Sequence, residues 1–147
     1  MKYRKYIIQL ILPFTFLAIG GFIYIFFREN NVILNYYLRR GVILNLQNSL
    51  FTNIIYNNII LNFLINSVPG GLWSFFLLRL IGIIWQNQLN FNYYAFIFLS
   101  LSLIFIPEYM QYFGFLPGFF DSKDIISYSL FSIFALFLNS KEVKDEK

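Results

Sequence analysis

The side chains with the most chemistry to offer are acidic and amide groups gathered in a short stretch near the C-terminus. Glu108 and Gln111 are three residues apart, which places both on one face of a helix. Asp121 and Asp124 have the same spacing, and Tyr128 follows one turn beyond Asp124 on the same face. Carboxylates partly withdrawn from water can act as general acids or bases, and their oxygens can bind polar ligands or divalent cations.

Glycine and proline residues separate these two polar pairs. Pro107 precedes the first pair, and Gly114, Pro117 and Gly118 lie between the pairs. Because these residue types interrupt regular helix, we expect residues 108–124 to form a compact corner that joins two helices. Such a corner would bring three carboxylates and one amide close together.

Arg79 is the only charged residue in the apolar stretch 71–85. A charge within a membrane span costs about 2.5–3.5 kcal/mol on insertion scales and usually faces the protein interior or water. Counted from Gly71, Arg79 lies about 12 Å inward, and Glu108 lies about 8 Å from the same membrane surface. Since the arginine stem can bridge that difference, we expect an Arg79–Glu108 ion pair. The alternative is that Arg79 reaches lipid headgroups or a partner.

The two aspartates also have a structural explanation. An Asp at or near the first turn of a helix caps backbone amides and suits the helix dipole, which accounts for Asp124 in particular. Capping does not explain Glu108, Gln111 or Arg79. We therefore expect a binding site, and if the site is catalytic, Glu108 and Asp121 are the candidate acid and base. The predicted binding residues are Arg79, Glu108, Gln111, Asp121, Asp124 and Tyr128.

The composition indicates the solvent in which these residues must be positioned. Of 147 residues, 59% are hydrophobic, 22% are aromatic and 12% are charged, whereas a soluble domain carries about 25% charged residues. This excludes disorder and disfavours a soluble domain. Zero Cys and zero His remove thiolate, iron–sulfur and Ser-His-Asp chemistry, so we expect no metal and no cofactor. The basic residues form no patch, which argues against a nucleic-acid partner.

Long apolar stretches predict an all-α fold, a polytopic transmembrane helical bundle. The first stretch, 6–27, has 22 residues without charge, about 33 Å of helix, and exceeds the core of a signal peptide. We expect about four spans, near 6–27, 70–86, 93–113 and 119–139. Residues 1–140 would form a single transmembrane domain, followed by a charged cytoplasmic tail, 141–147.

The segment 41–66 is rich in Ile and Leu but also contains seven Asn and one Gln. Asn58, Asn62 and Asn66 are spaced four residues apart, which places their amides on one helical face. We interpret the segment as an interfacial amphipathic helix or a helix shielded by the other spans. A fifth span is the alternative.

The distribution of Lys and Arg predicts the orientation. With four spans, both termini share one side and place six basic residues there, against four on the other side. By the positive-inside rule both ends are cytoplasmic, and we expect a multi-pass protein of the bacterial inner membrane.

The polar corner resembles the C-terminal signature of VanZ-like membrane proteins. In that family a Glu-x-x-Gln motif ends one span, a glycine-containing loop follows, and an Asp-x-x-Asp motif opens the last span; here these correspond to 107–111 and 118–128. The segments 20–28 and 67–75 look like upstream segments of short VanZ-like proteins. Many members have Arg or Thr after the loop glycine, where this chain has Phe119, which weakens the idea of an anion-binding loop.

The resemblance implies a cell-envelope protein of a family named for glycopeptide antibiotic resistance, and it supplies no reaction. Our first hypothesis is an accessory or binding protein that recognises a lipid-linked or peptidoglycan-related group or a partner subunit. Membrane lipid, a lipid-linked envelope precursor and a membrane protein are then the expected partners. The alternative is an intramembrane enzyme that uses Glu108 or Asp121 as general acid or base on a lipid-linked substrate. The chain has no evident nucleophile and no histidine, so the first hypothesis is favoured.

Overall fold

The computed structural model describes residues 2–27, 58–85, 88 and 90–145, and within these ranges the chain is helical with no strand. The helices are α1 (Lys2–Phe27), α4 (Ile59–Asn66), α5 (Val68–Ile84), α6 (Phe91–Tyr112) and α7 (Ser122–Asp145). The all-α prediction is confirmed for the described residues.

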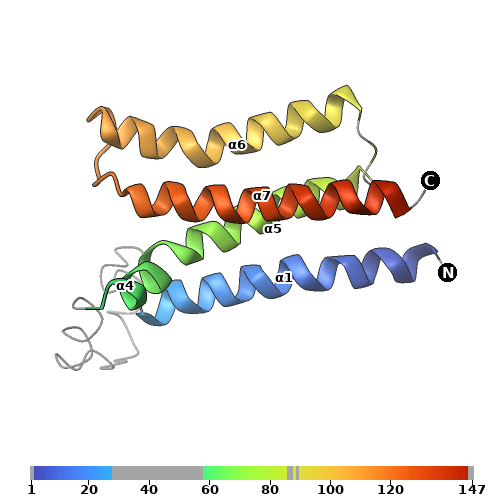
Figure 1. Ribbon diagram of the computed structural model, residues 1–147, viewed down its shortest axis with the longest axis horizontal. Coiled ribbons are helices and arrows are strands. Elements are labelled where there is room, and N and C mark those ends of the chain that lie inside the picture. The colour runs from blue at the N-terminus through green and yellow to red at the C-terminus, as the bar shows by residue number, and fades with distance from the viewer. Residues whose placement is uncertain (1, 28–57, 86–87, 89, 146–147) are drawn as a thin grey trace, which may run out of the picture.

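Four long helices lie along the long axis of the molecule (Figure 1). α1 and α6 run in one direction and α5 and α7 in the other, so the start of α1 and the end of α7 lie at the same end. α5 contacts all four other helices, and its main contacts are with α7 and α1. α5 is thus the central helix, on which the others assemble.

Glycines on α5 let α7 approach closely. A Cβ atom added at Gly71 would collide with the hydroxyl of Ser127 and the ring of Phe131. A Cβ atom added at Gly82 would collide with the amide of Asn139. The earlier glycine of α5 meets the earlier residues of α7, and the later glycine meets the later one. The two helices therefore run in the same direction. Small residues at such contacts are characteristic of helix pairs in membranes.

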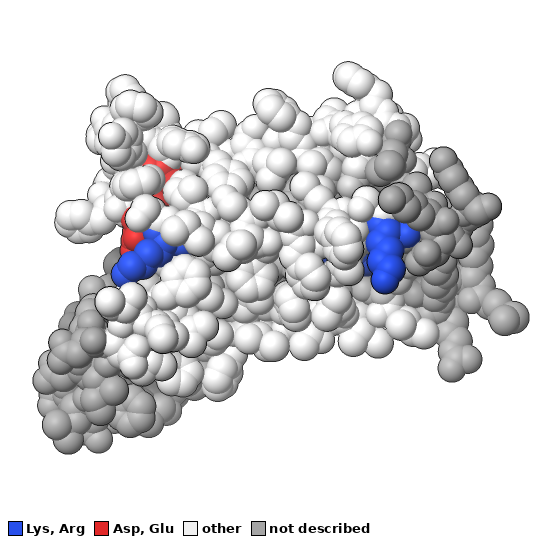
Figure 2. Space-filling model, in the orientation of Figure 1, with Lys and Arg blue, Asp and Glu red and all other residues white. Residues whose placement is uncertain are grey.

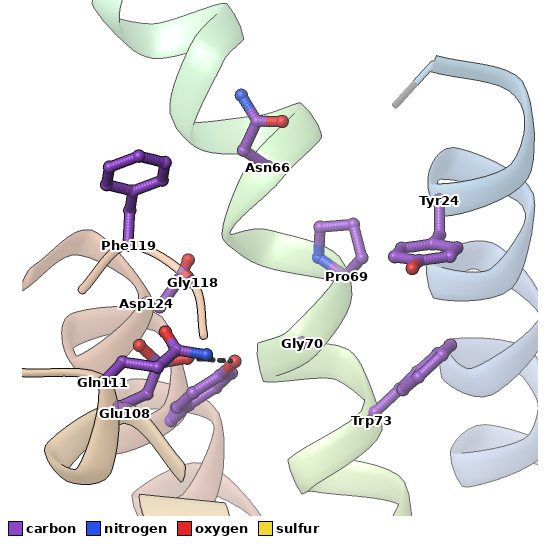
Figure 3. A pocket seen from close by; sticks show the side chains of 11 residues that line it. Tyr24, Asn66, Pro69, Gly70, Trp73, Glu108, Gln111, Gly118, Phe119 and Asp124 are labelled. Atoms are coloured by element: carbon purple, nitrogen blue, oxygen red, sulfur yellow. Dashed lines mark hydrogen bonds between the residues drawn. The ribbon is translucent and has the colours of Figure 1, made fainter. Parts of the chain in front are cut away.

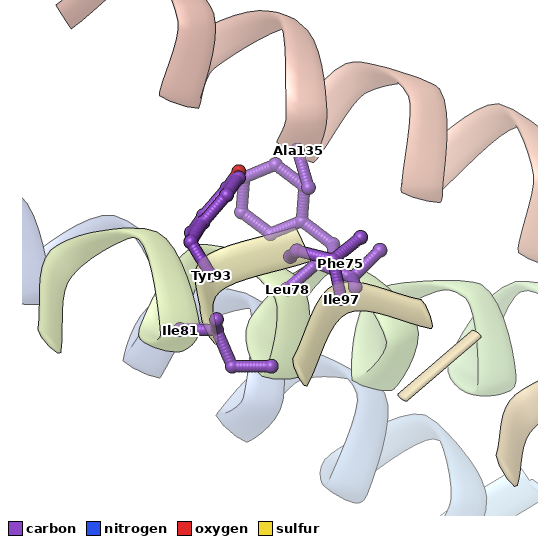
Figure 4. Packing of buried hydrophobic residues seen from close by; sticks show 6 residues of the cluster. All are labelled: Phe75, Leu78, Ile81, Tyr93, Ile97 and Ala135. Carbon is purple, nitrogen blue, oxygen red and sulfur yellow. The ribbon is translucent and has the colours of Figure 1, made fainter. Parts of the chain in front are cut away.

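A small apolar core lies between α5, α6 and α7 (Figure 4). The members of this cluster are buried and come from three helices: Phe75, Leu78, Ile81, Tyr93, Ile97 and Ala135. α1 joins the cluster through Phe16, whose ring lies 4.6 Å from that of Phe75 between centroids. These contacts hold the four long helices in one bundle.

The outside of the bundle is also apolar. Large side chains such as Phe98, Leu103 and Ile133 are between 64% and 74% exposed. Charged residues gather at the two ends of the long axis, and on the visible face a broad uncharged area separates them (Figure 2). Exposed apolar surface of this extent marks an interaction with lipid. The protein therefore associates with the membrane.

Two helices are each long and apolar enough to cross a membrane, over Ile7–Ile25 and Phe91–Tyr112. A third span results when α4 and α5, which are bent by 40°, are counted as one broken span. α7 is long enough, but charges at both ends and buried polar residues such as Ser132 and Asn139 leave it less apolar. Two of the four predicted spans thus correspond to helices that can cross alone.

The two expectations for Pro107 differ in outcome: the predicted stretch 93–113 agrees with the bounds of α6, and the interruption of helix at Pro107 is wrong. α6 continues through Pro107 to Tyr112, as α1 continues through Pro13. Proline is tolerated inside helices in membranes, because neighbouring helices and local adjustments satisfy the freed carbonyl. The predicted break after the helix is confirmed, since Gly114 (φ 75°) and Gly118 (φ 138°) adopt left-handed backbone that favours glycine.

The Asn-rich segment is described only from residue 58, and 41–57 lies outside the described residues. Its described part is the eight-residue α4, about 12 Å long, too short to span a membrane alone. Asn58 caps this helix, and its side-chain oxygen accepts from the backbone N–H groups of Ile60 and Leu61. At the other end of the chain, α7 continues through Lys141, so the predicted tail begins within this helix.

Candidate functional site

A pocket of about 520 Å³ lies at the end of the bundle where α6 turns into α7 (Figure 3). All five helices contribute to its walls, together with the loop between α6 and α7. One wall is polar and the other is mainly aromatic.

The polar wall contains four of the six predicted site residues. Glu108 and Gln111 lie at the end of α6, and Asp124 and Tyr128 lie in the first turns of α7. The hydroxyl of Tyr128 donates a hydrogen bond to Glu108 Oε1 at 3.4 Å (Figure 3). The structure therefore brings Asp124 and Tyr128 to the same wall as Glu108 and Gln111, as the predicted corner requires.

Glu108 is the most enclosed of these residues, with 8% of its surface exposed. Its Oε2 atom is buried and makes no hydrogen bond to any described residue. A buried carboxylate oxygen without a donor is costly, because it has lost water and gained nothing in exchange. The described residues form no cluster of three or more His, Cys, Asp or Glu that could hold a metal ion. The free lone pairs of Glu108 therefore suit a ligand that donates hydrogen bonds.

Two glycines give this wall its shape. A Cβ atom at Gly70 would lie 2.5 Å from Tyr128 Cε1 and 3.0 Å from its hydroxyl, so Gly70 lets the tyrosine ring lie against α5. Gly118 has left-handed backbone, and a Cβ atom there would lie 2.9 Å from the amide carbon of Gln111. In the sequence, Gly70 was singled out only as part of 67–75, the segment that resembles VanZ-like proteins. No local pattern indicates that it faces Tyr128.

The aromatic wall was not predicted. Tyr24 on α1 and Trp73 on α5 line the pocket, with ring centroids 5.7 Å apart. Gly20 allows this contact, because a Cβ atom there would lie 3.1 Å from Trp73 Cδ1. Phe119, from the loop, lines the pocket and is 97% exposed. The upstream segments of family resemblance contain Tyr24 and Trp73, and this is the one signal that could have indicated them.

Asp121 has a different position from the one expected for a catalytic group. It precedes α7, and its Oδ1 atom accepts a hydrogen bond from the backbone N–H of Lys123 at 2.9 Å. It does not line the pocket, whereas Asp124 does. Asp124 lies in the first turn of α7, as its structural explanation requires, and because α7 begins at Ser122 the capping position itself belongs to Asp121.

Arg79 lies elsewhere in the bundle, with 2% of its surface exposed. Its Nη1 atom donates a hydrogen bond to Asn139 Oδ1. The Asn139 Nδ2 atom in turn donates to the Leu78 carbonyl at 3.1 Å and the Tyr93 hydroxyl at 3.2 Å. Tyr93 and Glu108 stand near opposite ends of α6, fifteen residues or about 22 Å apart. The predicted Arg79–Glu108 ion pair is therefore wrong.

The register of α5 against α7 explains this correction. Gly70 is level with Tyr128 near the pocket, and Gly82 is level with Asn139. Arg79 lies nine residues beyond Gly70, about 13 Å along the helix, and is thus closer to the Asn139 end. The sequence estimate of depth omitted Asn139, an uncharged side chain that offers both an acceptor and donors in the core.

Comparisons of the chain with protein-family models, with curated proteins and with solved structures find no match. The fold and the site together define a helical, membrane-associated protein with a polar pocket at one end of its bundle.

Proposed function

We propose that this protein is a VanZ-like integral membrane protein of the bacterial cell envelope, and that it binds the polar headgroup of a lipid-linked or peptidoglycan-related molecule in this pocket. The observation that carries the proposal is the buried Oε2 atom of Glu108, which lies in the pocket wall without a hydrogen-bond donor among the described residues. A ligand that donates hydrogen bonds would offset the cost of burying it.

The surroundings of the pocket support a ligand that comes from the membrane. The loop between α6 and α7 exposes Phe113 (66%), Phe115 (71%) and Phe119 (97%). Aromatic residues at the end of a span are typical of the level of lipid headgroups. A pocket beside this loop is accessible to a headgroup whose acyl chains stay in the apolar layer.

The direction of the helices supports the proposed topology of four spans. α1, α5, α6 and α7 alternate in direction along the chain, and the start of α1 and the end of α7 share one end of the bundle. We propose that this end is cytoplasmic in the bacterial inner membrane. The pocket, at the other end, then faces the outside, where envelope precursors are assembled into the wall.

The geometry favours binding over catalysis. The acid–base pair expected from the sequence, Glu108 and Asp121, is not assembled in the pocket, because Asp121 caps α7 and does not line it. Among the described lining residues there is no Ser, Thr or Lys that could serve as a nucleophile. Recognition of a partner subunit would use the same pocket for a polar side chain of the partner.

The experiment is to purify the full chain from native membranes in mild detergent and to identify the retained lipids and proteins by mass spectrometry. Asn66 lines the pocket at the end of α4, so Asn66→Phe should obstruct it. Asn62→Phe, one turn earlier and outside the lining, is the matched control. We expect one lipid class enriched over the bulk membrane in the wild type and Asn62→Phe and lost in Asn66→Phe. Bulk lipid composition in all three proteins would contradict headgroup binding, and a co-purified protein lost in Asn66→Phe alone would indicate the partner subunit.

A further inference from the structure

We propose that the group bound in this pocket carries a protonated amine, as the headgroup of an aminolipid does. This inference rests on the proposed function, headgroup binding, and adds the chemical class of the ligand.

The charge of the pocket favours a cation. Glu108 and Asp124 both line it, and no Lys or Arg is among the lining residues that the structure describes. A phosphate or carboxylate beside Glu108 would place a like charge next to a carboxylate that is only 8% exposed, where like charges repel strongly. An ammonium group instead offsets the cost of burying the carboxylate.

The hydrogen-bonding pattern of the polar wall is complementary to an ammonium group. Glu108 offers a buried Oε2 atom with no donor among the described residues. Asp124 adds carboxylate oxygens, and Gln111 adds an amide oxygen on the same wall. A primary ammonium has three N–H donors and no acceptor, so it can donate to Glu108 Oε2 and to a further oxygen of this wall.

The aromatic wall favours the same class of ligand. Tyr24 and Trp73 line the side of the pocket away from the carboxylates, and Phe119 lies on the side of Asp124 (Figure 3). The face of an aromatic ring attracts a cation, and indole does so most strongly. Carboxylates on one side and aromatic faces on the other are the two means by which proteins hold an ammonium group.

The exposed apolar loop indicates that the amine is attached to a lipid. Phe119 is both a lining residue and 97% exposed, and Phe115 in the same loop is 71% exposed. Acyl chains can therefore lie against this loop while the headgroup occupies the pocket. A small soluble amine would make no use of this surface.

The experiment uses the fluorescence of Trp73, which lines the pocket. In a Trp85→Phe variant Trp73 is the only tryptophan; Trp73→Phe leaves Trp85, which packs against Phe96 at the other end of α5, as the control reporter. The full chain in maltoside micelles is titrated with four ligands. These are dioctanoyl phosphatidylethanolamine, its N-acetyl derivative, dioctanoyl phosphatidylglycerol and soluble phosphoethanolamine.

We expect the ethanolamine lipid to bind at least about ten-fold more tightly than the N-acetyl lipid, since hydrogen bonds to a charged group are lost on acetylation. Glu108→Gln should reduce that preference, whereas Glu142→Gln, the same change about 27 Å from Asp124 along α7, should not. The acetylated ligand tests the wild-type protein, so the result does not depend on how well a variant folds.

Three other results would each refute one element of the proposal: the amine, the lipid source or headgroup binding. Equal binding of both ethanolamine lipids, or tighter binding of phosphatidylglycerol, would refute the amine and leave headgroup binding intact. Tight binding of soluble phosphoethanolamine would refute the lipid source. Failure of all four ligands, together with bulk lipid composition in the purified protein, would refute headgroup binding itself.

Discussion

Arg79 on α5 donates a hydrogen bond to the side-chain oxygen of Asn139, 60 residues later on α7. Both side chains are buried, with 2% and 0% of their surfaces exposed. Through its amide group Asn139 also reaches the Leu78 carbonyl and the Tyr93 hydroxyl. One asparagine thus links α5, α6 and α7 around the only charged residue within α5.

This relationship predicts strong coupling between the two residues. Asn139→Leu removes an acceptor from a buried guanidinium and should cost about 3–5 kcal/mol of unfolding free energy. The pair Arg79→Leu and Asn139→Leu should cost less than the sum of the single changes by about 0.5–3 kcal/mol. Denaturant unfolding in detergent, followed by circular dichroism, measures each value. The comparison is the double variant Arg79→Leu and Glu108→Gln. Its loss of unfolding free energy should equal the sum of the two single losses, and a smaller loss would be evidence for the Arg79–Glu108 ion pair.

The glycine contacts on α5 predict a difference between two identical substitutions. Gly82→Ala places a Cβ atom against the buried amide of Asn139 and should destabilise the bundle by about 1–3 kcal/mol. Gly21→Ala on α1 meets no atom within 4 Å and should be neutral or stabilise by about 0.5–1 kcal/mol, because alanine favours helix. Thermal unfolding in one detergent compares them, and equal effects would argue against close packing of α5 on α7.

Local patterns predicted the polar wall of the pocket, because they depend on neighbours in sequence. The i, i+3 spacing placed Glu108 and Gln111 on one face, and the glycines after Tyr112 predicted a turn that returns Asp124 to them. The helices themselves were predictable for a similar reason, because in lipid each backbone group must find its hydrogen-bond partner within the helix.

Contacts between distant helices could not be predicted in the same way. In a soluble helix the apolar face indicates the core, but α1 and α6 are apolar on all sides, so no periodicity shows which side faces a neighbour. Tyr24 and Trp73 were missed for this reason, and so was the register that brings Asn139 to Arg79. The sequence placed both Asp121 and Asp124 at or near the helix start, but which of them caps depends on the exact first residue of the helix, which the sequence does not determine.

The capping role of Asp121 predicts a graded series. Asp121→Ala removes the acceptor for the Lys123 N–H and should cost about 0.5–2 kcal/mol, whereas Asp121→Asn should cost little because Asn caps about as well as Asp. Asp124→Ala serves as the control, since Asp124 follows the cap and should cost less stability. Denaturant unfolding ranks the variants; if Asp121→Ala costs no more than Asp121→Asn, Asp121 is not the cap.

The proposed topology predicts a labelling pattern in this natively cysteine-free chain. A cysteine at Lys2 or Lys144 should be protected from an impermeant thiol reagent in intact cells and should react after the cells are opened. A cysteine at Lys123, near the pocket, should react in intact cells. Opposite labelling of the two ends would exclude an even number of spans.

The last prediction concerns function in the cell. If the pocket binds a headgroup through its carboxylates, Glu108→Gln and Asp124→Asn should fail to restore whatever phenotype deletion produces, for which we expect sensitivity to an envelope-directed antibiotic. Both variants should still accumulate in the membrane, because an amide keeps the shape and removes a charge from a site with little water. Asp121→Asn should restore growth most fully, since it keeps the cap and lies outside the pocket lining. Growth across an antibiotic series, with membrane abundance measured by immunoblot, separates loss of binding from loss of protein. Full restoration by all three variants at normal abundance would show that the corner is structural, and would direct attention to the Asn-rich segment 41–66.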